Sequence, residues 1–370
     1  MNINLKYVPI FRGRQQEFYV LKSFDFGENI YPCLEIIKEL DRMPPKQKGM
    51  GSSIKRREDK TFEKVYLPLI REIKSEKVFV DLPIHLKESR KMKLPTFSFL
   101  RTVVGDRLKR TEYIKKLEPL ASKVIPVIST YFGRSSERGS ILLQEKDLRP
   151  HFKSLAFRTF PDGFISRDLE QIKKVITIDD YLIMDWGETE LDITDEDQIE
   201  IVEQLRRLLC TVIIHRNSIS NELTNVGLEH NEKVDCIDNG LLEKYKDFGG
   251  DCFSDYAGIK KDEVNDGGTV SPGFIYYDAV RNEFYGFKGI YQRPETYETI
   301  MIPDIVNSAP TQRMKKSKLD YLGLRNVGWK ILDRIHNRQE PGQSAAKFKR
   351  IGMEHYLHCL REKIMEGFFN

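Results

Sequence analysis

The chain has 370 residues, of which 40% are hydrophobic and 31% are charged, and its formal net charge is +4. This composition excludes a disordered chain, and so small a net charge does not by itself require a nucleic-acid partner. No apolar run reaches the roughly 20 residues of a membrane helix, and MNINLKYVPI lacks the basic and apolar regions of a signal peptide, so we expect a cytoplasmic protein without membrane contact.

Eight short runs rich in β-forming residues recur along the chain, with amphipathic segments between them. The runs are YVPIF (7–11), IYPCLEII (30–37), VFVDLP (78–83), VIPVIST (124–130), SLAFRTF (154–160), DYLIMDW (180–186), TVIIHRN (211–217) and CFSDYAG (252–258). Strands that alternate with helices are typical of a parallel sheet. Eight such units match a TIM-like (β/α)8 barrel in number and length. An open doubly wound sheet is the main alternative, but no GxGxxG turn follows a run, so we predict the barrel.

Three of the intervening segments have helical periodicity. Apolar residues recur at steps of three and four in 61–73 and in 196–209, which predicts one buried face for each helix. The sequence TDED before the second helix supplies an N-cap and an acidic first turn. Ser166 is predicted to cap a third, shorter helix.

After residue 260 the alternation of strands and helices stops. The predicted C-terminal elements are a β-hairpin at 273–289 with its turn around 278–282, and helices at 327–335 and 345–365. We therefore predict a barrel over 1–260 with an appended α+β C-terminal subdomain over 261–370. The basic stretch 43–59 is predicted to be a mobile loop.

Polar residues stand near the end of almost every predicted strand. In a barrel these ends meet at one mouth, where polar side chains are disproportionately functional. The residues are Arg12, Arg14, Glu35, Asp81, Thr130, Arg158, Asp185, His215, Arg216 and Asp255. Asp81, Arg158 and Asp185 lie within otherwise apolar runs, where a buried charge needs a partner or a ligand. Internal pairing of arginine with aspartate that only holds the barrel together is the alternative interpretation.

Two kinds of site use such residues. Carboxylates bind divalent cations, and the candidate metal ligands are Glu35, Asp81, Asp185 and Asp255. Guanidinium groups bind phosphate through two parallel hydrogen bonds, and the candidate ligand-binding residues are Arg12, Arg14, Arg158 and Arg216, with Glu17, Glu35 and Asp255. The catalytic candidates are Asp81, Asp185 and His215, since histidine is the side chain whose unperturbed pKa lies nearest neutrality. We expect Glu17 at the start of the first helix, where it can pair with one arginine.

The sequence gives little support for other well-known kinds of site, such as disulfide frameworks, zinc sites and common catalytic motifs. The five cysteines are scattered and odd in number, so neither a disulfide framework nor a zinc site is predicted. The motifs GxSxG, the P-loop and HExxH are absent. His355 and His358 share one face of a predicted helix, but no third metal ligand accompanies them, so we interpret them as a polar helix face or an intramolecular contact.

The segments YVPIFRGRQQEFYVLKSF and IYPCLEII, followed by VFVDLP, VIPVIST and a late GMEHYLHCL, resemble the Beta-protein family of phages and bacteria across nearly the whole chain. Proteins of this kind tend to occur in mobile elements and beside phage-defence genes, sometimes next to a nuclease, which implies a partnered role and transfers no reaction. The residues that the resemblance covers are Arg12, Arg14, Glu17, Glu35, Asp81, Asp255 and His355. Where similar proteins often have a second histidine before the last of these, this chain has Glu354.

Three functions remain open at this point. The first is a binding or sensor protein of antiphage defence or of mobile elements, whose barrel mouth recognises a phosphorylated small molecule or nucleic acid and whose tail contacts an effector such as a nuclease. The second is a metal-dependent phosphodiester hydrolase that uses the strand-end carboxylates and His215, with a divalent cation as its cofactor. The third is a structural phage or assembly protein.

Overall fold

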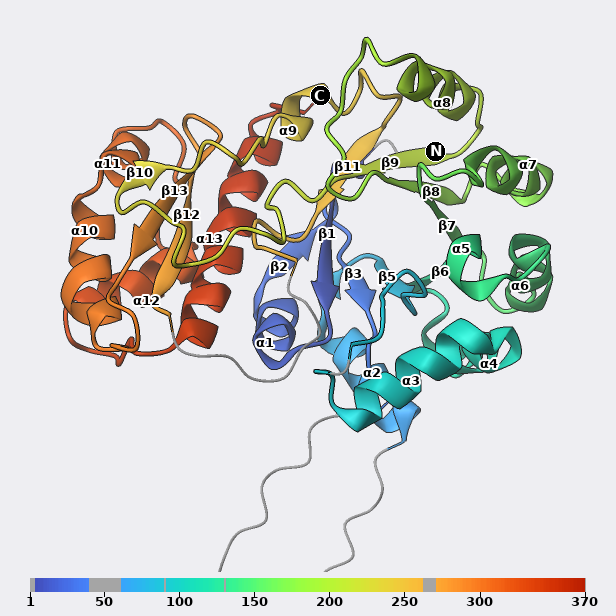
Figure 1. The fold of residues 1–370 in the computed structure, drawn as a ribbon, viewed down its shortest axis with the longest axis horizontal. Coiled ribbons are helices and arrows are strands. Elements are labelled where there is room, and N and C mark those ends of the chain that lie inside the picture. The colour runs from blue at the N-terminus through green and yellow to red at the C-terminus, as the bar shows by residue number, and fades with distance from the viewer. Residues whose placement is uncertain (1–3, 40–60, 90, 130, 262–270, 370) are drawn as a thin grey trace, which may run out of the picture.

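The computed structural model describes residues 4–39, 61–89, 91–129, 131–261 and 271–369 (Figure 1). The predicted loop at 43–59 and Thr130 lie outside these residues. Within them, eight strands close into one barrel. In spatial order the strands are β1 (Tyr7–Arg12), β11 (Cys252–Asp255), β9 (Thr211–His215), β8 (Tyr181–Asp185), β7 (Ala156–Thr159), β6 (Val124–Ser129), β5 (Val78–Asp81) and β3 (Cys33–Glu35).

Neighbouring strands of the barrel are parallel throughout, and each coincides with one of the eight predicted runs. β1 pairs with β11 on one side and with β3 on the other, which closes the sheet. The predicted TIM-like (β/α)8 barrel is therefore confirmed, and the alternative of an open sheet is wrong.

Helices surround the barrel and cover its outer face (Figure 1). They are α1 (Gln15–Ser23), α2 (Phe62–Glu72), α3 (Leu94–Gly105), α4 (Arg107–Lys115), η1 (Glu118–Leu120), α5 (Phe132–Ser135), α6 (Ser140–Leu148), α7 (Ile165–Val175), α8 (Glu196–Arg206) and α9 (Leu241–Lys244). Two short strands, β2 (Asp25–Gly27) and β4 (Lys74–Ser75), form a separate parallel pair. α2 and α8 confirm the two helices predicted with an apolar face.

The start of one helix agrees with the prediction from the sequence, and the start of another differs from it. The Asp195 carboxylate accepts a hydrogen bond from the Gln198 backbone N–H and caps α8, as predicted. The prediction that Ser166 caps the next helix upstream is wrong, because α7 already begins at Ile165. Asp162 explains the earlier start: its carboxylate accepts from the N–H of Phe164, and its carbonyl accepts from the N–H of Ile165.

Successive residues of each strand alternate between the barrel interior and the helix-covered outer face. The interior is filled by an apolar cluster that includes Val8, Ile10, Cys33, Phe79, Ile125, Val127, Ala156, Tyr181, Ile183, Ile213 and Cys252. The outer positions pack under the helices as a second, larger cluster. Because apolar side chains fill the barrel below, any polar site on its axis lies at the carboxyl ends of the strands.

The C-terminal part of the chain builds a second body beside the barrel (Figure 1). Its elements are β12 (Gly273–Asp278), β13 (Glu283–Lys288), η2 (Tyr297–Met301), α10 (Ile302–Asn307), α11 (Ala309–Lys315), α12 (Val327–His336) and α13 (Ala345–Met365). The predicted hairpin and both predicted helices are confirmed. β10 (Glu232–Lys233) lies before the predicted boundary at residue 260 and pairs with β13 beyond it. The two predicted domain ranges stay a prediction.

The two histidines of α13 bond within the chain. Nε2 of His355 lies 2.9 Å from the carbonyl oxygen of Tyr277, and Nε2 of His358 lies 2.7 Å from that of Asp320. Burial lowers the pKa of each imidazole to about 4. Both rings are therefore neutral at pH 7 and take part in intramolecular contacts.

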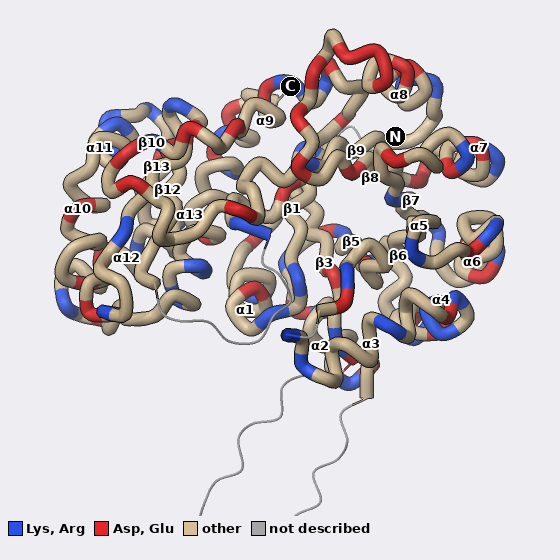
Figure 2. Tube along the Cα trace, in the orientation of Figure 1, with Lys and Arg blue, Asp and Glu red and all other residues tan. Residues whose placement is uncertain are grey.

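Most charged residues lie on helices and connecting segments (Figure 2). Acidic residues gather on α8 and on the segment before it, while lysine and arginine are spread over several other helices. In the part of the chain that the structure describes, no helix combines the length and the apolarity that a membrane crossing needs.

α13 is tied to the barrel through its inward face. The Tyr356 hydroxyl donates to the Asp255 carboxylate at 2.6 Å, and the Ser23 hydroxyl donates to Glu354 at 2.7 Å. The backbone also approaches α13 tightly at Gly258, which has φ +68° and whose added Cβ would lie 2.3 Å from Cγ of Tyr356. Only glycine fits this position, because both the backbone conformation and the available space exclude a side chain.

Gly258→Ala is therefore expected to lower the free energy of unfolding by about 2 to 4 kcal/mol, from left-handed strain and from overpacking against Tyr356. Gly27→Ala is the matched control, since Gly27 has φ +64° and open space around its Cα. The control is expected to lose about 1 kcal/mol from strain alone. Urea denaturation of both variants checks this, and equal losses would contradict a tight contact at Gly258.

Candidate functional site at the barrel mouth

A layer of polar side chains closes the carboxyl end of the barrel interior. All eight strands contribute one inward residue to it: Arg12, Glu35, Asp81, Ser129, Arg158, Asp185, His215 and Ser254. Strand register places several of them side by side, because Glu35 pairs with both Arg12 and Asp81 across β1, β3 and β5. All eight side chains are buried. A scaffold barrel fills this layer with branched apolar residues, so a wholly polar layer indicates a site.

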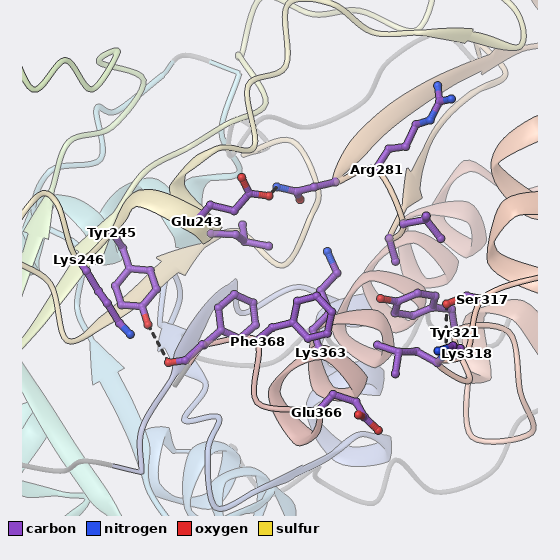
Figure 3. A pocket seen from close by; sticks show the side chains of 16 residues that line it. Glu243, Tyr245, Lys246, Arg281, Ser317, Lys318, Tyr321, Lys363, Glu366 and Phe368 are labelled. Atoms are coloured by element: carbon purple, nitrogen blue, oxygen red, sulfur yellow. Dashed lines mark hydrogen bonds between the residues drawn. The ribbon is translucent and has the colours of Figure 1, made fainter.

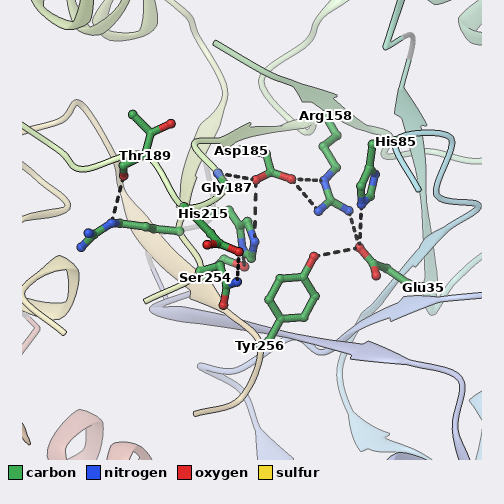
Figure 4. Close-up of polar contacts among 12 residues, drawn as sticks. Glu35, His85, Arg158, Asp185, Gly187, Thr189, His215, Ser254 and Tyr256 are labelled. Atoms are coloured by element: carbon green, nitrogen blue, oxygen red, sulfur yellow. Dashed lines mark hydrogen bonds and ion pairs between the residues drawn. The ribbon is translucent and has the colours of Figure 1, made fainter. Parts of the chain in front are cut away.

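Arg158 lies at the centre of this layer (Figure 4). One of its terminal nitrogens, Nη1, donates to Glu35 at 2.9 Å and to Asp81 at 2.6 Å. Its Nε and Nη2 donate to Asp185 at 3.0 and 2.6 Å. One guanidinium therefore bonds three carboxylates with a side chain that is fully buried. The pairing of arginine with aspartate that the sequence suggested is present.

The charges of the layer shift the pKa values of its carboxyl groups. Burial acts to raise the pKa of Glu35, but the guanidiniums of Arg12 and Arg158 outweigh burial and hold that pKa well below its usual range. Burial likewise opposes ionisation of Asp185, and Arg158 holds its pKa below the usual range. For Asp81 the effect of burial, together with that of the neighbouring carboxylates, exceeds the effect of Arg158. The pKa of Asp81 is therefore raised to about 6.

The charge of the layer is not balanced at Asp81. Its Oδ2 accepts from Arg158, whereas its Oδ1 is buried with no hydrogen-bond partner among the described residues. Three carboxylates face two guanidiniums, which leaves one net negative charge in the layer. Asp81 is therefore where an added cation is most favourable.

His85 joins the layer from the loop after β5. Its side chain is 7% exposed, and its ring packs at 5.4 Å, between centroids, on Phe160. Nε2 lies 3.5 Å from Oε1 of Glu35, and neither ring nitrogen has a hydrogen bond within the described part of the chain (Figure 4). Burial, with Arg158 adding to it, lowers the pKa of His85 well below its usual value. The ring is therefore neutral, which is the form that binds metals.

His215 stands on the other side of Arg158, next to Asp185. Its Nδ1 lies 2.9 Å from Oγ of Ser254, and its Nε2 lies 3.8 Å from Oδ1 of Asp185 (Figure 4). Burial lowers the pKa of His215 to about 4, so the ring is neutral at pH 7. Nε2 is buried and has no hydrogen-bond partner among the described residues.

Tyr256 and Lys261 complete the mouth on the side of β11. The hydroxyl of Tyr256 donates to Glu35 at 3.3 Å. The ammonium of Lys261 lies 5.1 Å from the centre of the Tyr256 ring and acts electrostatically on Glu35 and Asp185. Sequence reasoning missed His85, Tyr256 and Lys261, all of which follow a strand end. Of these three residues, His85 was the easiest to find from the sequence, because it follows Asp81 by four residues.

Four predicted site residues are not brought into this layer. Arg14 is at the start of α1 and lines a separate cavity of about 480 Å³. Glu17 acts on the pKa of Arg12, and it also pairs with Lys349 of α13 at 2.7 Å. Arg216 points outward and pairs with Asp238 at 2.9 Å.

Asp255 is the predicted metal ligand that lies elsewhere. Its carboxylate accepts from the hydroxyls of Tyr7 and Tyr356 and from the N–H of Ala257, all on the outer face of the barrel. The reason is strand alternation: Ser254 and Tyr256 point inward, so the residue between them points outward. Asp255 joins the barrel to α13 and does not share a site with Glu35 and Asp81.

Glu35, Asp81 and His85 form a group that fits a metal ion. One donor atom from each lies within 4.8 Å of the other two. Ligands at about 2.1 Å from a metal lie about 3 to 3.5 Å apart, so the group closes around an ion with small side-chain movements. Two carboxylates and one imidazole suit a first-row divalent cation such as Mn²⁺ or Zn²⁺. The buried unpartnered Oδ1 of Asp81 and the unprotonated nitrogen of the neutral His85 ring supply the free lone pairs.

A family model described as Beta protein matches residues 7–361, nearly the whole chain. No curated protein and no solved structure matches it significantly.

Proposed function

We infer that this chain, which belongs to the Beta-protein family, is a metal-dependent phosphodiester hydrolase with its active site at the barrel mouth. The family membership supplies no reaction, so the inference depends on the geometry of the mouth. One observation carries it: around Arg158, the buried Oδ1 of Asp81, both nitrogens of His85 and Nε2 of His215 have no hydrogen-bond partner within the described residues.

That observation favours a site over a structural ion-pair network. A network that only holds a barrel together satisfies its buried polar atoms, because each unsatisfied one costs about 1 to 3 kcal/mol. Here the unsatisfied atoms of the polar layer and of His85 include two kinds of metal ligand and one base, and these lie at the end of the barrel where enzymes of this fold have their active sites. Such atoms are available to an ion and a substrate.

Glu35, Asp81 and His85 would hold a divalent cation, which polarises a phosphoryl oxygen and lowers the pKa of a bound water. Adding it to a layer with one net negative charge leaves one net positive charge, which suits a phosphodiester anion. Arg12 and Arg158 are already bonded to carboxylates and serve to fix those carboxylates in place. Lys261 is then the cation of the mouth that faces the substrate phosphate.

His215 is suited to accept a proton. It is neutral at pH 7, and Ser254 at its Nδ1 fixes the ring orientation. Oδ1 of Asp185, held by the N–H of Gly187 at 2.9 Å, is positioned to stabilise the imidazolium that forms. Asp185 is itself held by two bonds from Arg158, which also bonds Glu35 and Asp81, so one guanidinium positions both the base and the carboxylate metal ligands.

The experiment is an assay of the purified chain with bis(p-nitrophenyl) phosphate and Mn²⁺. We expect release of p-nitrophenol that falls by at least about 100-fold after chelation with EDTA and returns when Mn²⁺ is restored. A panel of cyclic dinucleotides and short single-stranded DNA then identifies the natural substrate class. Absence of turnover on the whole panel, or turnover that chelation leaves unchanged, would contradict a hydrolase.

A second candidate function is a ligand sensor that signals to a partner protein, such as a nuclease of phage defence. β11 favours it, because Ser254 and Tyr256 face the mouth while Asp255 between them bonds Tyr356 of α13. A ligand that moves Tyr256 therefore affects how α13 docks on the barrel through a single residue, Asp255. Slower amide exchange in α13 on binding of a phosphodiester, without any turnover, distinguishes the sensor from the hydrolase.

A further inference from the structure

A cavity of about 660 Å³ lies between the barrel side and the C-terminal body, away from the mouth (Figure 3). Its walls come from α9, from the turn between β12 and β13, from the segment 317–321 and from the end of α13. The volume is in the range of sites that take small organic ligands, about 300 to 1,000 Å³.

Lys363 reaches this cavity from α13 as a buried cation. The residue is 7% exposed, and its Nζ donates to the hydroxyl of Tyr277 at 3.2 Å. In the described part of the chain its ammonium forms no ion pair with a carboxylate, and the Tyr277 hydroxyl is the group that accepts its hydrogen bond. Burial lowers the pKa of Lys363. A buried ammonium without a carboxylate partner is costly, and an anion in the cavity would offset that cost.

The charged side chains that line the cavity are mostly cationic, like Lys363. The lining contains four cationic and two anionic side chains, which leaves a net charge of +2: Lys246, Arg281, Lys318, Lys363, Glu243 and Glu366. Figure 3 shows the Lys363 side chain extending between Glu243 and Tyr321. A small anion is therefore favoured over a cation in this space.

The remaining walls are apolar or aromatic. Leu242 and Leu319 line the cavity together with Tyr321, and Phe368 stands at its edge with 64% of its side chain exposed. The exposed Phe368 ring offers a face on which a flat apolar group of a ligand can pack. The ligand suited to this cavity thus combines an anionic group with an apolar or aromatic body.

We propose that this cavity is a second ligand site, which binds an amphipathic anion with its phosphate or carboxylate at Lys363 and its apolar body against Tyr321 and Phe368. The site is separate from the barrel mouth, because none of its lining residues belongs to the polar layer around Arg158. Its test does not depend on hydrolysis.

The probe is 1-anilinonaphthalene-8-sulfonate, an aromatic anion whose fluorescence rises on binding. We expect wild-type protein to bind it at one site, and Lys363→Met to bind it about 10- to 100-fold more weakly, since a charged hydrogen bond is lost. N-phenyl-1-naphthylamine, its neutral analogue, is expected to bind both proteins equally. Competition by AMP or by octanoate distinguishes a phosphate ligand from a carboxylate ligand.

Lys330→Met is the control, because Lys330 is an exposed lysine of α12 outside the cavity lining. It is expected to leave the affinity for the probe unchanged. Phe368→Ala provides a second variant that changes an exposed residue and leaves the core intact, and it is expected to weaken binding several-fold. The proposal is overturned if the wild-type protein does not bind the probe, or if Lys363→Met and Phe368→Ala both bind it as Lys330→Met does.

Discussion

Replacing Arg158 with methionine is expected to lower the free energy of unfolding by about 3 to 5 kcal/mol. The guanidinium bonds Glu35, Asp81 and Asp185, and every one of these side chains is buried. Methionine leaves three carboxylates in a dry interior with Arg12 as the remaining cation of the layer. Removing one partner of a buried pair leaves an uncompensated charge, and here it leaves two.

Urea denaturation of Arg158→Met measures this loss. Arg207→Met is the control, because Arg207 is 74% exposed and pairs with Glu203 at 3.7 Å on the surface of α8, where such a pair contributes about 0.5 kcal/mol or less. Asp185→Asn in the Arg158→Met background is expected to recover at least about 1 kcal/mol, since it removes one stranded charge. A loss of less than 1 kcal/mol from Arg158→Met would refute the charge-balance account of the layer.

Replacing Asp81 with asparagine is expected to reduce hydrolysis of bis(p-nitrophenyl) phosphate by at least about 100-fold while the fold persists. The amide oxygen of asparagine can still accept from Nη1 of Arg158, which Asp81 accepts from at 2.6 Å. The amide nitrogen cannot bind a cation, so the variant removes the carboxylate oxygen of the polar layer that has no hydrogen-bond partner among the described residues. His85→Ala is expected to act in the same direction through the loss of its imidazole.

Asp179→Asn is the matched control for this prediction, since Asp179 is 50% exposed and pairs with Lys153 on the surface. It is expected to keep full activity. The affinity for Mn²⁺, measured by calorimetry, separates metal binding from chemistry: Asp81→Asn loses affinity for the metal, whereas Asp185→Asn keeps it and loses rate. Unchanged turnover in both Asp81→Asn and Asp185→Asn would rule the hydrolase out.

The barrel could be predicted from the sequence because its signal is local. Runs such as VFVDLP and VIPVIST have strand composition and length, and the amphipathic segments between them leave few topologies besides a parallel sheet. The first residue of a helix was harder to predict. Ser166 is an example: a turn at Asp162 lets α7 begin at Ile165, before the expected cap.

The direction of each side chain was harder to predict. Both faces of a barrel strand are apolar, since one faces the interior and the other faces helices, so hydrophobicity does not reveal which residues point inward. Asp255 was assigned to the mouth for that reason, although its neighbours Ser254 and Tyr256 are the inward residues. Arg12, Glu35, Asp81, Arg158, Asp185 and His215 do come together, because each is the last or nearly last inward residue of its strand.

The metal ligand from a loop could not be predicted in this way. His85 meets Glu35 only because the chain turns back over the mouth after β5, and that path is fixed by contacts distant in sequence, such as its packing on Phe160. The burial of Lys363 could not be predicted for the same reason. It lies against Tyr277 because α13 docks on the hairpin. Residues of this kind become candidates only when the fold is known.

Diffraction from crystals grown with Mn²⁺ and recorded near the manganese absorption edge is the most direct test of the proposed metal site. We expect one anomalous peak at the barrel mouth, bounded by the carboxylates of Glu35 and Asp81 and by the ring of His85, and no peak at Asp255. A mouth that stays free of metal at Mn²⁺ concentrations well above those of the assay would contradict it, and so would a peak at any other site of the chain with the mouth empty.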